Sequence, residues 1–79
     1  MSSAIAKVFS DRQYCIDEML RIRDTWGFRP TFTREAIDAA RISLGFMALY
    51  CPEGLRDMVM ATIDELGRRE LYALIGGRA

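Results

Sequence analysis

Carboxylates and thiols are the side chains of this chain that could carry chemistry. The acidic side chains that come into question form five groups, namely Asp17/Glu18, Asp24, Glu35/Asp38, Asp57 and Asp64/Glu65. Glu35 and Asp38 are three residues apart, so a helix would place both carboxylates on one face, where they could hold a divalent cation. Magnesium sites, however, usually add a substrate phosphate or several converging oxygens. We therefore expect these carboxylates to be solvated charges on helix surfaces.

The two cysteines, Cys15 and Cys51, could form a nucleophile, a redox pair or a disulfide. The chain contains no histidine, so no imidazole is present to activate a thiol or to shuttle protons. The cysteines also lack C-x-x-C spacing. If the helices pair in antiparallel fashion with a turn near Pro30, the cysteines lie about 9 Å apart along the helix axis, beyond the roughly 7 Å Cα limit of a disulfide. We expect two reduced cysteines that pack in the core.

The charge balance argues against nucleic acid as a ligand. Eleven basic and 11 acidic residues give a formal net charge of +0, whereas a basic face is the usual footprint of nucleic-acid binding. With no histidine, no convincing metal-ligand set and no activated nucleophile, we expect a protein that is not an enzyme and that needs neither a metal nor another cofactor.

The length and the hydropathy pattern predict one small domain. We expect a single helical domain over residues 1–79, with residues 1–9 and 76–79 as candidates for flexible ends. The longest apolar stretch, Leu44 to Cys51, is far shorter than the roughly 20 residues that span a bilayer. The N-terminal residues lack the apolar segment of a signal peptide, and a secreted domain of this size would normally carry more cysteines. We expect a cytoplasmic protein that makes no membrane contact.

Helical periodicity predicts an all-α fold, a compact small bundle of three main helices plus a short C-terminal helix. The main helices are expected near 11–26, 34–50 and 55–66, and the short helix near 68–75. Residues 4–9 could add a helical turn or a separate short helix.

Residues typical of helix ends support these boundaries. Ser10 and Gln13 have the spacing of a capping box, and Gly27 is placed as the left-handed residue that ends a helix. Thr33 is a candidate N-cap, and Gly67 is expected to interrupt or cap the third helix.

The apolar stripes of these helices predict the core and leave apolar surface over. The expected buried residues are Ile16, Met19, Leu20, Ile37, Leu44, Met47, Leu55, Val59 and Ile63. The charge-free stretch from Ile42 to Cys51 presents apolar residues around most of a helix, and Gly45 within it would permit close approach of a neighbouring helix. We therefore expect self-association, most simply as a homodimer.

Aromatic residues and arginine gather around the first connection. The segment Trp26 to Phe32 contains three of the eight aromatic residues of the chain, and these residue types dominate binding hot spots. These side chains either close the end of the bundle or contact a partner. The expected partner-binding residues are Trp26, Phe28, Arg29, Phe32, Met60 and Tyr72.

These observations favour a non-catalytic protein-binding module, an adaptor or an inhibitor that docks on a larger protein assembly. In size and composition the chain resembles phage and mobile-element proteins that block host machinery, including nucleic-acid-targeting defence complexes. The alternative is a small helix-turn-helix-like DNA-binding transcriptional regulator, built from the helices at 34–50 and 55–66. Its recognition helix would offer only Arg56 as a cation, next to several carboxylates that would face phosphate.

Overall fold

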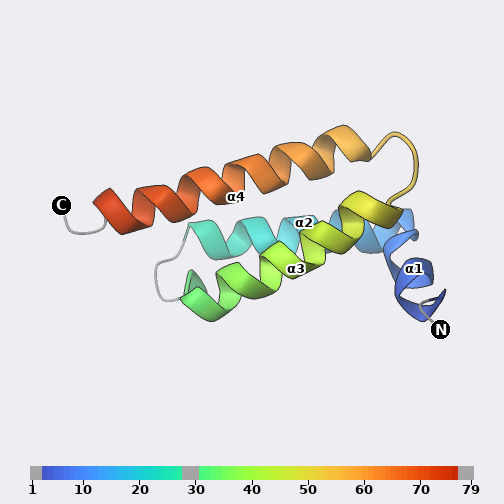
Figure 1. Cartoon of the computed structure of the whole chain (residues 1–79), viewed down its shortest axis with the longest axis horizontal. Coiled ribbons are helices and arrows are strands. Elements are labelled where there is room, and N and C mark those ends of the chain that lie inside the picture. The colour runs from blue at the N-terminus through green and yellow to red at the C-terminus, as the bar shows by residue number, and fades with distance from the viewer. Residues whose placement is uncertain (1–2, 28–30, 77–79) are drawn as a thin grey trace.

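The computed structural model describes residues 3–27 and 31–76, and in this part of the chain the long elements are all helices. In chain order they are α1 (Ser3–Phe9), α2 (Arg12–Trp26), α3 (Arg34–Tyr50) and α4 (Arg56–Gly76). The all-α bundle of three main helices and one short helix is confirmed. Helices α2, α3 and α4 run alongside one another, and α1 lies at the end of the bundle where α2 begins (Figure 1).

The short helix, however, is α1 at the N-terminus, and the predicted break at Gly67 is wrong. Residues 68–75 belong to α4, which continues without interruption from Arg56 to Gly76. Ion pairs span the glycine, because Arg68 pairs with Asp64 at 2.6 Å and Arg69 pairs with Glu65 at 2.9 Å. Ion pairs at this spacing favour the helical conformation and so oppose the cost of about 1 kcal/mol that a glycine brings to a helix interior.

Helix α2 begins one residue later than the sequence predicts. The backbone N–H of Tyr14 donates to the Asp11 carboxylate at 3.1 Å, so Asp11 is the N-cap and the predicted capping box at Ser10 is wrong. The Ser10 hydroxyl instead donates to the Lys7 carbonyl at 3.0 Å, at the end of α1. The Ser10 hydroxyl therefore belongs to the end of α1. The sequence had left open whether residues 4–9 form such a short helix.

Two further predictions concern the start of α3 at Thr33 and the end of α2 at Gly27, and the first is confirmed while the second is wrong. Thr33 caps α3, since its hydroxyl accepts from the Ala36 N–H at 3.1 Å. Gly27 ends α2 with right-handed backbone angles (φ −86°, ψ −1°) and not in the left-handed region. Among the described residues only Gly54 has a positive φ, 97°, at the turn before α4, where a side chain would be strained.

The core lies between α2, α3 and α4. Its buried apolar side chains are Cys15, Met19, Ile22, Ile37, Ala40, Leu44, Met47, Leu55, Val59 and Leu66. Most of the predicted core is confirmed, and the predicted Ile16 and Ile63 are partly buried against it. The prediction that Leu20 is buried is wrong, since its side chain is 56% exposed. It lies one residue, or about 100° of helix rotation, from the buried Met19 and so points away from the bundle.

Two buried groups with hydrogen-bonding capacity are satisfied within the core. The Thr62 hydroxyl donates to the Met58 carbonyl at 2.8 Å. The Cys15 thiol donates to the Phe9 carbonyl at 3.0 Å, and burial raises the pKa of this thiol. Cys15 and Cys51 are both free. The Cys15 contact links the end of α1 to α2.

Helices α3 and α4 form an antiparallel pair that leaves the end of α4 uncovered. Arg34, the first residue of α3, pairs with Glu70 in the C-terminal part of α4 at 2.7 Å. At the other end of the pair, Arg56, the first residue of α4, donates to the carbonyl of Ala48 near the end of α3 at 2.7 Å. The C-terminal part of α4 extends past the ends of α2 and α3 (Figure 1). The radius of gyration is accordingly 13.2 Å, against about 11.6 Å for a compact domain of this length. No described helix is both long and apolar enough to cross a membrane.

Candidate functional site

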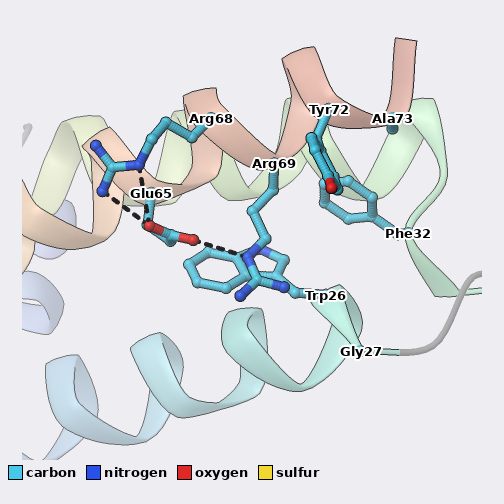
Figure 2. A pocket seen from close by; sticks show the side chains of 8 residues that line it. All are labelled: Trp26, Gly27, Phe32, Glu65, Arg68, Arg69, Tyr72 and Ala73. Carbon is cyan, nitrogen blue, oxygen red and sulfur yellow. Dashed lines mark hydrogen bonds and ion pairs between the residues drawn. The ribbon is translucent and has the colours of Figure 1, made fainter. Parts of the chain in front are cut away.

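A pocket of about 640 Å³ lies where the C-terminal part of α4 passes the end of α2 and the segment before α3. The residues that line it are Trp26, Gly27, Phe32, Glu65, Arg68, Arg69, Tyr72 and Ala73 (Figure 2). We call this site the aromatic pocket, because its three aromatic side chains come from three separate segments of the chain.

The structure brings together three of the residues that the sequence proposes for partner binding. Trp26, Phe32 and Tyr72 all line the aromatic pocket. Met60 is 49% exposed and lies outside the lining. The proposed Phe28 and Arg29 lie outside the described residues.

The local sequence explains how the three aromatic side chains are placed. Trp26 is the last residue of α2, and Phe32 directly precedes the Thr33 cap of α3. Both are partly buried and pack against the core, which fixes the position of their rings. Tyr72 comes from the extended end of α4 and is 79% exposed. The pocket therefore combines two anchored aromatic walls with one accessible wall.

Glu70 fixes the position of α4 above the pocket. Its carboxylate accepts from Arg41 and, at 2.7 Å, from Arg34, so two cations of α3 hold one side chain of α4. Hydrogen bonds from Arg41 and then from Arg34 lower the pKa of Glu70. A carboxylate with a lowered pKa stays ionised well below neutral pH, and the link between α3 and α4 persists there.

Two guanidinium groups lie against the Trp26 indole. The Cζ atoms of Arg69 and Arg23 are 5.2 and 5.4 Å from the centre of the ring, within the range of cation–π attraction. Arg69 is oriented by Glu65, whose carboxylate accepts from its Nε at 2.9 Å (Figure 2). Hydrogen bonds from Arg69 and then from Arg68 lower the pKa of Glu65. Glu65 is therefore ionised at neutral pH and positions the two arginines.

The indole N–H of Trp26 has no acceptor among the residues that the structure describes, although the nitrogen is buried. A buried donor without a partner costs about 1–3 kcal/mol. Buried polar groups are paired in most proteins, so an unpaired one calls for a physical reason.

Glu65 and Arg69 line the pocket but are not among the site residues predicted from the sequence. The expected break at Gly67 separated Glu65 from the residues that follow. In one continuous helix, residues 65, 69, 72 and 73 are spaced i, i+4, i+7 and i+8 and share one face. That spacing was the available signal.

The lining residues are suited to binding. Aromatic and aliphatic carbon forms the walls, and guanidinium groups supply directed donors. Within residues 3–27 and 31–76, no group of three histidine, cysteine or acidic side chains is placed to hold a metal ion.

Comparison of the chain with protein-family models, with curated proteins and with solved structures finds no match. Its function has to be inferred from the residues of the aromatic pocket and the surfaces around it.

Proposed function

We propose that this protein is a non-catalytic binding module, an adaptor or an inhibitor that docks on a larger cytoplasmic protein assembly through the aromatic pocket. The observation that carries the proposal is the convergence of Trp26, Phe32 and Tyr72 beside Arg69, because Trp, Tyr and Arg are the residues that contribute most at protein interfaces. A short inhibitor of phage or mobile-element origin that occludes a host complex fits this profile.

The end of α4 offers further contact surface around the pocket. Leu71, Leu74 and Ile75 are 57%, 67% and 65% exposed on the part of α4 that extends past the bundle. Neighbouring apolar side chains that are exposed together often mark an interaction surface. A partner that fills the pocket would also cover part of this helix end.

The helix-turn-helix alternative lacks comparable support. Helices α3 and α4 lie antiparallel, with contacts near both ends, whereas the two helices of that motif cross at about 90–120°. Arg68 and Arg69 of α4 are paired with Asp64 and Glu65, which would face the phosphate backbone.

The proposal predicts that Tyr72→Ala weakens capture of the partner by about tenfold, while Leu20→Ala does not. Both side chains are exposed, so neither change should alter stability by more than about 0.5 kcal/mol. Leu20 is the matched control because it lies on α2, outside the pocket. The tagged full-length variants are used to capture proteins from a nuclease-treated lysate of the native host, and bound proteins are quantified by mass spectrometry. Capture that depends on nucleic acid, or that survives Tyr72→Ala unchanged, contradicts the proposal.

We also propose that the chain self-associates through the outer face of α3. Ile42 and Leu49 are 63% and 67% exposed on either side of Gly45. A Cβ atom at Gly45 would meet nothing within 4 Å, so no described helix of the same chain approaches this glycine closely. The expected neighbouring helix is therefore not found within the described chain. A second copy would cover the side chains of Ile42 and Leu49.

Self-association predicts a mass above the 9.0 kDa of the monomer that rises with protein concentration in light scattering. Leu49→Lys should give the monomer mass, because it places a charge at the centre of a two-fold contact. Leu20→Lys, an equal change on an exposed site of α2, should leave the mass unchanged. A monomer mass for the unaltered protein at every concentration tested would overturn this proposal.

A further inference from the structure

The hydrogen-bond donors around Trp26 outnumber the acceptors that the described residues supply. The indole N–H is buried and has no acceptor in the described part of the chain. Arg23 lies over the same ring and makes no ion pair with any described residue, its one hydrogen bond being a long contact of 3.4 Å to the Thr62 hydroxyl. Among the described residues, the only ion-pair partner of Arg69 is Glu65, which it shares with Arg68. The described surroundings of Trp26 therefore carry one uncompensated positive charge, on Arg23 beside the pocket lining, and one unused donor, the indole N–H.

The chemistry that satisfies these groups is a carboxylate. A carboxylate accepts several hydrogen bonds at once and bears the charge that Arg23 lacks. A neutral carbonyl could accept from the indole but would leave the charge of Arg23 unpaired. Because Asp64 and Glu65 lie on the same helix segment, a single carboxylate is favoured over a run of phosphates, which these two side chains would repel.

The rest of the lining is suited to an apolar side chain next to that carboxylate. Phe32, Tyr72 and Ala73 line the same pocket as Trp26 (Figure 2). The Arg69 side chain lies against the indole and is 46% exposed, so it can turn outward and follow an incoming carboxylate.

We propose, on the basis of the protein-binding function proposed above, that the aromatic pocket binds a partner segment in which an aromatic side chain stands next to an aspartate or glutamate. The aromatic ring enters between Phe32 and Tyr72. Arg69 turns away from the indole to admit the carboxylate, which accepts from the Trp26 N–H that is buried in the free protein. The carboxylate also pairs with Arg23, which lies over the indole beside the pocket lining.

Trp26 supplies a direct readout, because it is the single tryptophan of the chain. In ¹⁵N-labelled protein its indole N–H gives one side-chain resonance. The probe is a set of hexapeptides, blocked at both ends, in which one Asp stands before or after one Phe. At least one of these peptides should shift the indole resonance saturably and downfield, as expected for a new hydrogen bond. The matched peptide with Asn in place of Asp should bind about two- to fivefold more weakly. The peptide with Ala in place of Phe should not saturate.

Two variants separate a specific pair from general attraction to a cation. Arg23→Gln should abolish the preference for Asp over Asn, whereas Arg12→Gln should retain it. Both residues lie on α2, and Arg12 makes no ion pair with a described residue either, so the two changes remove the same charge at opposite ends of one helix. An unmoved indole resonance, equal binding of the Asp and Asn peptides, or an equal loss of preference in both variants would overturn the inference. The first two outcomes need only the unaltered protein, so the test does not depend on the folding of a variant.

This inference and the proposed function fail in different ways. If capture of a protein partner depends on Tyr72 but the indole resonance ignores the acidic peptides, only the carboxylate inference is wrong. If capture does not depend on Tyr72, the pocket is not the docking site for that partner.

Discussion

Leu44→Ala is expected to lower the free energy of unfolding by about 2–5 kcal/mol, the range found when a buried leucine is truncated. Leu44 is 0% exposed and belongs to a core that also contains Met47 and Val59. The side chains around Leu44 can close only part of the cavity that the truncation leaves. Because small domains have only about 5–15 kcal/mol of total stability, a large part of the population should unfold at moderate temperature. Denaturation in urea, followed by circular dichroism, measures the change.

Leu49→Ala is the matched control for this result. Leu49 is the same residue type on the same helix, but it is 67% exposed. The control should change the free energy of unfolding by less than about 0.5 kcal/mol. Equal costs at Leu44 and Leu49 would contradict the placement of the core, and the experiment should be run at low protein concentration so that self-association does not contribute.

The main helices were predictable because two kinds of signal agree along the chain. The apolar stripe of α3 and the Thr33 cap both indicate a helix that begins at residue 34, and the structure confirms both. In α4 the signals conflict. Gly67 favours a break, whereas the ion pairs of Arg68 and Arg69 and the burial of Leu66 favour continuation, and the helix continues. The helix propensity of Gly67 alone therefore does not predict whether α4 continues past it.

Helix α1 was left open because its stability comes from tertiary contacts and not from its own sequence pattern. The Phe9 ring packs edge-on against Tyr14, with centroids 5.5 Å apart, and stacks with Phe46 of α3 at 5.6 Å. A seven-residue helix is too short to be stable alone in water. Its existence therefore depends on a partner that is distant in sequence.

The aromatic residues of the candidate site could be predicted from the sequence, but the charged residues that join them in the pocket could not. Trp26, Phe32 and Tyr72 stand out as aromatic residues that a small core need not bury. The roles of Glu65 and Arg69 depend on the register of α4 against α2, which is set by packing in the shared core and by the two arginines of α3 that hold Glu70. A contact between elements that are about 40 residues apart leaves no local pattern in the sequence.

Trp26→Ala and Trp26→Phe are expected to differ sharply in their effect on stability. Trp26→Ala removes a partly buried ring that packs against the core, together with its contacts to Arg23 and Arg69, and should cost about 2–3 kcal/mol. Trp26→Phe keeps an aromatic ring and removes the buried N–H that has no acceptor in the described part of the chain. Relief of that unsatisfied donor offsets the smaller ring, so the cost should stay below about 1 kcal/mol.

Urea denaturation of the two variants, followed by circular dichroism, distinguishes these cases. If Trp26→Phe is as costly as Trp26→Ala, the indole N–H finds an acceptor in the folded chain, and the donor is then not free for a ligand. If Trp26→Phe is nearly neutral for folding and yet weakens binding of the acidic peptides, the N–H contributes to recognition and not to the stability of the bundle. The indole of Trp26 would then be held in place by the core while its nitrogen is kept for the partner.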